Sequence, residues 1–407
     1  MNCRGCNSEK TSLFLDLGHS PISNEFLDLG QLRIAEAHYP LKVYVCDRCG
    51  MVQIPEVTKK ENLFSDNYVY FSSFSSSWLN HSKEFASKMI AEYSITNEDL
   101  VLEIASNDGY LLQYFKSLGI KVLGVEPAKS VAEVAVSKGI ETISAFFGTD
   151  LALKLRAQGI SPKVIVANNV LAHVPDIHDF INGVSILLDG QGLATFEFPH
   201  LSNLMELNQF DTVYHEHYSY LSYEALKPIF ASHGLDIFQI ENLSTHGGSL
   251  RLFVAPHDSR KIETLEIQNL ESREKKWSPR NSTNVQNLRS NALKTKLDFL
   301  SKLLDLKNLG LTVAGYGAAA KGNTLLNYCG IDSDLISYIV DRNPAKQGKF
   351  LPGSHIPVLP ESVFESTPPD VVIIFPWNLK SEIRLQLSAQ LGPDVKFMVT
   401  VPEVQFI

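Results

Sequence analysis

The stretch FDTVYHEHYSYLS, residues 210–222, gathers histidines, a carboxylate and tyrosines within a short segment. Tyr214, His215, Glu216 and His217 follow one another directly. Adjacent histidines beside a carboxylate suit metal binding or proton transfer, because imidazole exchanges protons near neutral pH. A strand whose rings fill a core would show a similar pattern, so the segment alone leaves both interpretations open.

Five cysteines form a second chemical pattern, because four of them occur in two Cys-x-x-Cys pairs. In a reducing compartment such pairs favour a metal site over disulfides. Four thiolates satisfy tetrahedral zinc completely, so the predicted site is closed and structural. The pairs are Cys3 with Cys6 and Cys46 with Cys49, and the remaining Cys329 is expected to be a buried packing residue.

Composition and charge favour a multidomain globular protein over a nucleic-acid-binding or membrane protein. The 407 residues are 44% hydrophobic, which is enough for two or three domains with sizeable cores. A formal charge of −9 gives no broad basic surface, so nucleic acid is not an expected partner. The N-terminus lacks an apolar segment, and apolar runs such as residues 371–375 are too short to span a bilayer. We expect a cytoplasmic protein with no membrane partner.

The elements that must position the chemistry begin near residue 100. A strand ending at Ile104, a turn, a helix to about Leu118 and a second strand ending before Glu126 open a doubly wound sheet. Residues 164–180 fit its fourth strand, ending at Asn168 and Asn169, where cofactor edges are normally bound. Residues 192–201 fit another strand, which would place the histidine segment at the ligand edge of the sheet.

The turn after the first strand indicates which cofactor binds there. A dinucleotide would favour G-x-G-x-x-G, whereas residues 105–109 read ASNDG, with one glycine and one acid. This turn would repel pyrophosphate and suits S-adenosylmethionine, which has no phosphate. Glu103 and Asp108 are expected to face its ammonium group, and Gly109 to permit close approach. Glu126 is expected to accept hydrogen bonds from both ribose hydroxyls.

Two later segments have open interpretations. In residues 244–256, His246, Ser249 and Arg251 surround a Gly-Gly turn, which suits either an anion site or an ordinary hairpin. Residues 290–310 predict a linker helix whose core-facing side carries Leu293, Leu297, Leu300 and Leu304.

A second α/β unit is predicted from residue 311 onward. Gly315, Gly317 and Ala320, with Asp341 further on, approximate the dinucleotide fingerprint and raise the possibility of an NAD site. Two α/β units therefore compete for the chemistry.

The motifs taken together resemble a known family. CRGC with CDRCG, YVYFSS, EIASNDGYLL, GVEPA, ANNVLAHV, FDTVYHEHYSYLS, HGGSLR, GYGAAAKGNTLLN and VDRNPAKQGKFLPGSHIPV occur in the order typical of the three-domain S-adenosylmethionine-dependent C-methyltransferases of deoxysugar biosynthesis. The resemblance covers nearly the whole chain. It implies an α/β fold with a zinc-binding domain at 1–65 and a class I methyltransferase-type, Rossmann-like doubly wound sheet at 66–257. A helical linker and a Rossmann-like substrate domain, which does not use NAD, would follow at 258–407.

The resemblance also implies the roles of single residues. The general base falls on His217, its supporting carboxylate on Glu216, and active-site tyrosines on Tyr214 and Tyr68, with Tyr70 one strand period away. His215 is a further candidate donor to an enolate oxygen. Cofactor-binding residues are expected to be Glu103, Ser106, Asn107, Asp108, Gly109, Glu126, Pro127, Asn168, Asn169 and His173. Substrate-binding residues are expected to be His246, Ser249, Arg251, Tyr316, Lys321 and Asn323.

The implied reaction methylates the carbon beside the ketone of a nucleotide-linked 4-keto-6-deoxy sugar, with dTDP or GDP as the nucleotide. C3 is the expected position, and C5 is the alternative. We expect a monomer. The family usually has Gly where Ala105 stands. A zinc-containing RNA methyltransferase, an NAD-linked nucleotide-sugar oxidoreductase and a non-catalytic zinc scaffold are the alternatives from other classes.

Overall fold

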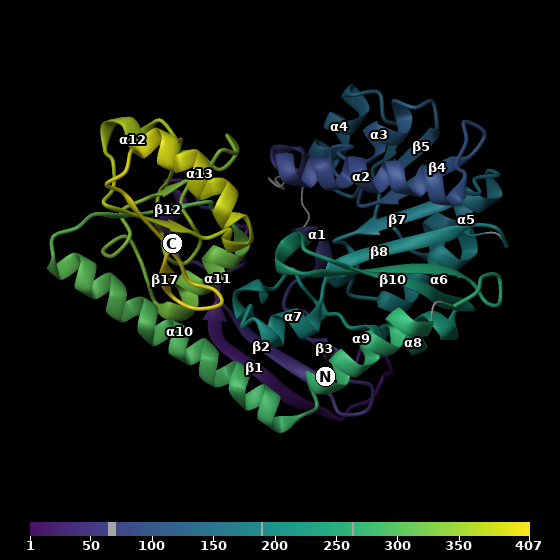
Figure 1. Cartoon of the computed structure of the whole chain (residues 1–407), viewed down its shortest axis with the longest axis horizontal. Helices are drawn as coiled ribbons and strands as arrows, with labels where there is room; N and C mark the ends of the chain where they lie inside the picture. The colour runs from purple at the N-terminus through teal and green to yellow at the C-terminus, as the bar shows by residue number, and fades with distance from the viewer. Residues whose placement is uncertain (64–70, 189, 263) are drawn as a thin grey trace. The chain divides into compact units, whose positions relative to one another are not determined.

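The computed structural model describes residues 1–63, 71–188, 190–262 and 264–407, which form two compact units (Figure 1). The first unit consists of Met1–Ser12, Val45–Ser202 and Tyr218–Ser278. The second consists of Leu13–Tyr44, Asn203–His217 and Pro279–Ile407. The units therefore draw on interleaved stretches of sequence. The division into three consecutive domains stays a prediction.

The first unit contains the predicted doubly wound sheet, so the α/β fold class is confirmed. Its strand order is β10-β11-β8-β7-β4-β5-β6, and β11 runs antiparallel to both of its neighbours. The central strands are apolar throughout because helices cover both faces of the sheet. The strands are β4 (Leu100–Ile104), β5 (Lys121–Val125), β6 (Thr142–Ile143), β7 (Val164–Asn168), β8 (Leu193–Pro199), β10 (Leu235–Leu243) and β11 (Ser249–Pro256).

Helices α2, α3 and α4 cover one face of this sheet, and α5, α6 and α8 cover the other (Figure 1). Several begin at side-chain caps: Ser75, Asp176 and Ser222 accept a backbone N–H in the first turn of α2, α6 and α8. The helices of this part of the chain are α1 (Lys60–Leu63), α2 (Ser76–Tyr93), α3 (Leu112–Lys116), α4 (Lys129–Ser137), α5 (Thr149–Ala157), α6 (Ile177–Leu187), α7 (Leu201–Glu206), α8 (Tyr223–Ser232) and α9 (Thr264–Lys276).

Short strands accompany the two main sheets. In the first unit β3 (Val52–Gln53) pairs antiparallel with β9 (Ser219–Tyr220). Strands β1 (Thr11–Ser20) and β2 (Tyr39–Cys46) lie mostly in the second unit.

The second unit is built on another sheet, with strand order β14-β13-β12-β15-β16-β17. All neighbouring pairs are parallel except β16 with β17, and the predicted C-terminal Rossmann-like domain is present. The strands are β12 (Val313–Tyr316), β13 (Ile339–Val340), β14 (Val358–Leu359), β15 (Val371–Ile374), β16 (Lys396–Val399) and β17 (Gln405–Phe406). The helices are α10 (Ser282–Asn308), α11 (Ala320–Cys329), α12 (Val363–Ser366) and α13 (Lys380–Leu391).

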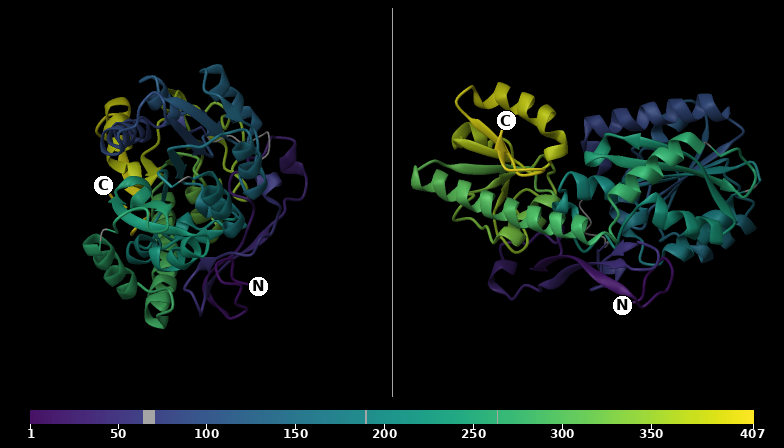
Figure 2. Two further views of the ribbon diagram at one scale, coloured as in Figure 1. Left: turned by 90° about the vertical axis from the view of Figure 1, so that its right-hand side faces the viewer. Right: turned by 60° about the horizontal axis from the view of Figure 1, so that its bottom comes forward.

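The long helix α10 can be followed in the right-hand view of Figure 2, and the exposure of its side chains corrects one expectation. Leu293, Leu297 and Leu304 are 50%, 58% and 51% exposed, so the predicted leucine face is not the core face. The buried side instead carries Phe299 and Leu303, together with smaller residues such as Ala292 and Thr295. The periodicity alone was misleading because both sides of the helix repeat apolar residues at helical spacing.

This orientation predicts unequal costs for the same truncation. Leu303→Ala should destabilise the protein by about 2–5 kcal/mol, because it leaves a cavity in the core. Leu297→Ala should change stability by less than about 0.5 kcal/mol, since that side chain already contacts water. Urea unfolding of both variants measures the difference. If both variants lost the same free energy of unfolding, the side of α10 that carries Leu297 would have to be covered in solution.

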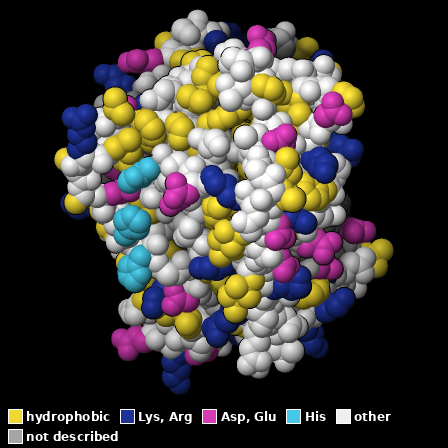
Figure 3. All heavy atoms as spheres, turned by 90° about the vertical axis from the view of Figure 1, so that its left-hand side faces the viewer, with side chains coloured by type: hydrophobic (Ala, Val, Ile, Leu, Met, Phe, Trp, Pro, Cys, Tyr) yellow, Lys and Arg dark blue, Asp and Glu magenta, His cyan; other side chains and the backbone are white. Residues whose placement is uncertain are grey.

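The surface and the helices bear on membrane and nucleic-acid binding. No helix within the described ranges is long and apolar enough to cross a membrane. On the face drawn in Figure 3, basic and acidic side chains are interspersed. That face therefore carries no broad basic area of the kind that phosphate backbones require.

Candidate functional site

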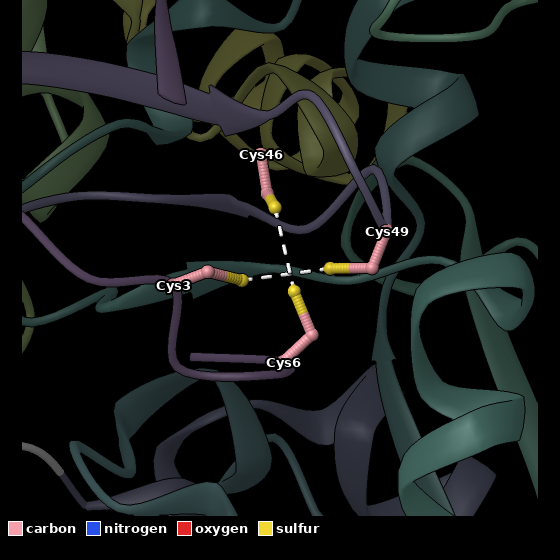
Figure 4. Close-up of side chains that lie close together, drawn as sticks. All are labelled: Cys3, Cys6, Cys46 and Cys49. Carbon is pink, nitrogen blue, oxygen red and sulfur yellow. Dashed lines mark hydrogen bonds between the residues drawn. The ribbon is translucent and has the colours of Figure 1, made fainter. Parts of the chain in front are cut away.

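The four paired cysteines lie together in the first unit (Figure 4). Their Sγ atoms are within 4.8 Å of one another, with Cys3 3.5 Å from Cys49 and Cys6 3.6 Å from Cys46. Thiolates about 2.3 Å from a zinc ion are about 3.8 Å apart in a tetrahedron. The hydrogen bond with Cys49 lowers the pKa of Cys3 to about 5, which favours a thiolate. The cluster fits the predicted closed zinc site.

The two cysteine pairs lie in two separate backbone turns of the same kind. Asn7 and Gly50 directly follow the second cysteine of their pairs, and both have positive φ, 56° and 77°. The Asn7 N–H donates to the Cys3 carbonyl at 2.9 Å, and the Gly50 N–H donates to the Cys46 carbonyl at 2.9 Å. Glycine and asparagine tolerate this conformation best, so the local sequence suits the turn.

The turn at residues 105–109, the cofactor turn, follows β4 and has an unusual backbone. Ala105, Asn107 and Gly109 have φ of 56°, 50° and 78°. A Cβ at Gly109 would lie 2.3 Å from Ile140 Cδ1, so packing also requires glycine there. For alanine the left-handed conformation costs about 1–2 kcal/mol. This explains why glycine would suit position 105, although the alanine here keeps the turn.

Glu126 closes the cofactor turn from the end of β5. Its Oε2 accepts the Asn107 N–H at 3.0 Å, and its Oε1 accepts the Ala128 N–H at 2.9 Å. Burial raises the pKa of Glu126 to about 7, although these two donors oppose the shift. Pro127 follows directly and is partly exposed. The carboxylate is thus oriented and ionises close to neutral pH.

Several buried polar atoms around the cofactor turn suit a polar ligand. Ser106 Oγ, Asp108 Oδ1 and Asn168 Oδ1 are buried, and none has a hydrogen-bond partner among the described residues. Asp108 Oδ2 pairs with Lys138 at 3.2 Å. Burial also raises the pKa of Glu103 well above its ordinary value, so a nearby cation would stabilise its carboxylate. These groups suit the ammonium and adenine ends of S-adenosylmethionine.

A residue at the end of β7 is hydrogen-bonded to His246, which was predicted to bind substrate. Asn169, with φ of 52°, lies 3.1 Å from His246 Nε2 through its Nδ2. The His246 ring is 4.9 Å from that of Trp78 in α2, an aromatic neighbour that local patterns did not indicate. His173 ends a short 3-10 helix, Leu171–His173, after β7.

Arg251 and Ser249 have structural partners. Arg251 is 2% exposed, and its guanidinium donates to Glu197 and to Glu241, the latter at 2.8 Å. Its charge is therefore already balanced, which does not favour an added anion. Ser249 is also buried, and its Oγ donates to the Thr245 carbonyl at 3.1 Å. Their roles toward a substrate stay predictions.

Residues 210–217, the base segment, do not form a strand. Phe210–Thr212 make a 3-10 turn, and the chain continues irregularly until β9. The segment belongs to the second unit, as part of Asn203–His217. The expectation that it directly follows the ligand edge of the first sheet was wrong, because α7 and this turn intervene after β8.

Both ring nitrogens of His217 are engaged. Nδ1 lies 3.0 Å from the Thr212 carbonyl, which can only accept, so Nδ1 carries the proton. In the neutral ring Nε2 is then an acceptor, and the Tyr214 hydroxyl lies 2.7 Å from it. The structure thus selects the tautomer with a basic Nε2. A backbone carbonyl fixes this ring, a role that sequence reasoning had given to Glu216.

Glu216 is instead anchored to a distant residue. Asn24 Nδ2 donates to both of its oxygens, at 2.9 and 2.7 Å, across 192 residues of sequence. Burial raises the pKa of Glu216 to about 7 and lowers that of His215 to about 4. His215 donates from Nε2 to the Pro40 carbonyl at 3.3 Å. Predicted positions 68 and 70 lie outside the described residues.

In the dinucleotide-like motif of the second unit, other side chains occupy the space next to the glycines. A Cβ at Gly315 would lie 2.6 Å from the Phe375 ring, and one at Gly317 would lie 2.5 Å from Pro376 Cγ. Asp341 accepts the Ala318 N–H at 2.8 Å. The second glycine normally lets a pyrophosphate approach the backbone, and here proline takes that space. The geometry does not fit NAD at this motif.

Predicted substrate residues of this unit have protein partners too. The Tyr316 hydroxyl donates to Glu361 at 2.6 Å, and Lys321 Nζ donates to Asn378 at 2.7 Å. Asn323 Nδ2 donates to the Ser23 carbonyl at 3.5 Å. Whether they also bind substrate stays a prediction.

Known proteins are similar to this chain along its whole length. A zinc binding domain model matches residues 3–64, a methyltransferase domain residues 78–240 and a C-methyltransferase C-terminal domain residues 244–402. The C-methyltransferase NovU of Streptomyces niveus is 32% identical over 405 residues, which covers 100% of this chain and 96% of NovU.

Solved structures are similar over part of the chain. The magnesium protoporphyrin IX methyltransferase ChlM of Synechocystis PCC 6803 with bound SAH is 17% identical, with a TM-score of 0.35 over 44% of this chain and 83% of ChlM. The PH0226 protein of Pyrococcus horikoshii OT3 is 12% identical, with a TM-score of 0.38 over 49% of this chain and 99% of that protein.

Proposed function

We propose that this chain, which belongs to the S-adenosylmethionine-dependent C-methyltransferase family, methylates the carbon beside the ketone of a nucleotide-linked 4-keto-6-deoxy sugar. The observation that carries the proposal is the His217 tautomer, because a basic Nε2 is the group that α-proton removal needs. C3 is the proposed position, in a cytoplasmic, monomeric enzyme acting on a dTDP or GDP sugar.

The chemistry explains the residues of the base segment. A carbon next to a ketone becomes nucleophilic only after it loses a proton, so the enzyme needs a base and a donor for the enolate oxygen. His217 Nε2 takes the α-proton, while the Thr212 carbonyl stabilises the resulting imidazolium through Nδ1–H. The Tyr214 hydroxyl, which is hydrogen-bonded to Nε2 in the structure, donates to the enolate oxygen in the reaction. His215, the other candidate donor, already gives its Nε2 proton to the Pro40 carbonyl.

The first unit binds the methyl donor, S-adenosylmethionine. S-adenosylmethionine carries a methyl group already activated on a sulfonium, so no catalytic metal is needed in this proposal. Asp108 and Glu103 bind its ammonium end, Glu126 binds the ribose hydroxyls, and Asn168 and Asn169 bind the adenine side. The protein then contributes alignment and exclusion of water.

The test of the function is a substrate panel. Purified protein is incubated with methyl-labelled S-adenosylmethionine and dTDP- and GDP-linked 4-keto-6-deoxy sugars, with the matching 4-hydroxy sugars as controls. We expect label in keto sugars alone, because only these acidify the neighbouring carbon. Transfer to the hydroxy sugars at an equal rate would contradict carbon methylation through an enolate.

The ionisation of Glu126 gives a pH prediction. Since its pKa is about 7 and the ribose hydroxyls donate to its ionised form, affinity for S-adenosylhomocysteine should weaken as pH falls from 8 to 6. The limiting slope is about tenfold per pH unit. Calorimetry should show weaker binding with a flatter pH dependence for Glu126→Gln. Wild-type affinity that stays constant over this range would place the ribose elsewhere.

A further inference from the structure

The C-terminal sheet presents an edge where ligands usually bind. Its strand order reverses between β12 and β15, and open α/β sheets bind ligands outside the carboxyl ends of strands at such a reversal. Here a carboxylate of the same chain lies at this edge. Trp377, which follows β15, donates from Nε1 to Asp211 Oδ2 at 2.7 Å. Asp211 is 1% exposed.

A lysine completes the surroundings of that carboxylate. Lys321 lies in the first turn of α11, with Nζ 4.3 Å from the Trp377 ring centroid and bound to Asn378. Burial raises the pKa of Asp211 to about 6, and the charge of Lys321 opposes the shift. Asp211 is thus a buried carboxylate held by Trp377 at the edge of the sheet where ligands usually bind.

A second contact fixes the same stretch of chain. Thr324, one turn further along α11, donates from Oγ1 to the Val213 carbonyl at 2.9 Å. Residues 211 and 213 are therefore both attached to the end of the C-terminal sheet. Between them lies Thr212, whose carbonyl accepts the Nδ1 proton of His217.

We infer that the ligand edge of the C-terminal sheet holds the base segment in place of a nucleotide, and that Asp211 and Trp377 are positioning residues for His217. The inference rests on the proposed function, since it gives His217 the role of base. The attachment of residues 211 and 213 fixes the Thr212 carbonyl, and this carbonyl fixes the tautomer and orientation of the imidazole. Lys321 contacts Asn378 and the Trp377 ring in this structure, whereas the sequence had suggested a substrate contact.

Trp377→Phe tests the inference while keeping an aromatic ring at this position. It removes the indole N–H that Asp211 accepts, together with the five-membered part of the ring. We expect kcat and the rate of α-proton exchange to fall by about 10- to 100-fold, because small misplacements of a catalytic group have effects of that size. KM for the nucleotide sugar and affinity for S-adenosylhomocysteine should stay within about twofold. Trp277→Phe, which also loses an indole beneath a lysine, is the matched control and should be unchanged.

Lys321→Met separates the two roles of that lysine. If Lys321 serves Asp211, kcat should fall while KM stays constant. A raised KM with constant kcat would show a phosphate contact and overturn the inference, as would a wild-type kcat for Trp377→Phe. Asp211→Leu removes the acceptor of the Trp377 N–H and is the second variant should Trp377→Phe not fold; it should lower kcat with an unchanged KM. If His217→Asn exchanges the α-proton at the wild-type rate, His217 is not the base and the inference fails with that role. If that variant is inactive, a normal Trp377→Phe refutes the positioning role alone.

Discussion

His217→Asn should slow both methyl transfer and exchange of the substrate α-proton with deuterated water by about 10²- to 10⁴-fold. A general base contributes a rate factor in that range. Asparagine keeps a donor for the Thr212 carbonyl but has no nitrogen that accepts a proton. Affinity for S-adenosylhomocysteine and zinc content should stay at wild-type values, since the base segment belongs to the second unit and the cofactor turn to the first. Exchange is measured by NMR with the keto sugar and S-adenosylhomocysteine.

Two comparisons make this result specific. His257→Asn changes a side chain that is 68% exposed and should leave exchange unaffected. Glu216→Gln should slow exchange less than His217→Asn, since Glu216 is bound by Asn24 while both ring nitrogens of His217 have other partners. Exchange at full rate in His217→Asn would transfer the role of base to His215 or Tyr68.

Cys46→Ser should have the largest effect on stability. Structural zinc contributes about 10–16 kcal/mol of apparent binding free energy in zinc-finger peptides, so loss of one ligand should release the metal and unfold the cysteine turns. Metal analysis should give about one zinc per chain in the wild type and much less in the variant. Activity should be lost with it.

Cys329→Ser is the matched control, because Cys329 is also buried but lies outside the cluster. It should keep zinc and most of its activity, at the cost of about 1–3 kcal/mol for a buried hydroxyl. A Cys46→Ser protein that is metal-free and still fully active would contradict a structural role for zinc.

Much of the fold could be predicted because local rules and tertiary packing agree there. Strand β4, the cofactor turn and Glu126 follow from apolar runs that end in polar residues, the pattern of strands buried on both faces. The cysteine pairs were equally informative, since metal geometry restricts their spacing.

Other features depend on contacts that sequence patterns do not encode. Asn24 reaches Glu216 across 192 residues, and Trp377 reaches Asp211 across 166. The choice between two apolar sides of α10 was decided by the residues packed against it, so the leucine stripe was assigned to the wrong side. The proton on His217 is set by a carbonyl, a group that every residue carries and that no motif marks.

The interleaving of the two units limits how this enzyme can be recombined with its relatives. A chimaera that exchanges only residues 279–407 would join a foreign C-terminal sheet to a native Asn203–His217 segment, and the Asp211 and Val213 contacts would then link mismatched parents. The second unit should be transplanted as three stretches, Leu13–Tyr44, Asn203–His217 and Pro279–Ile407, exchanged together. For protein engineers the module is therefore discontinuous, and a single crossover point cannot isolate it.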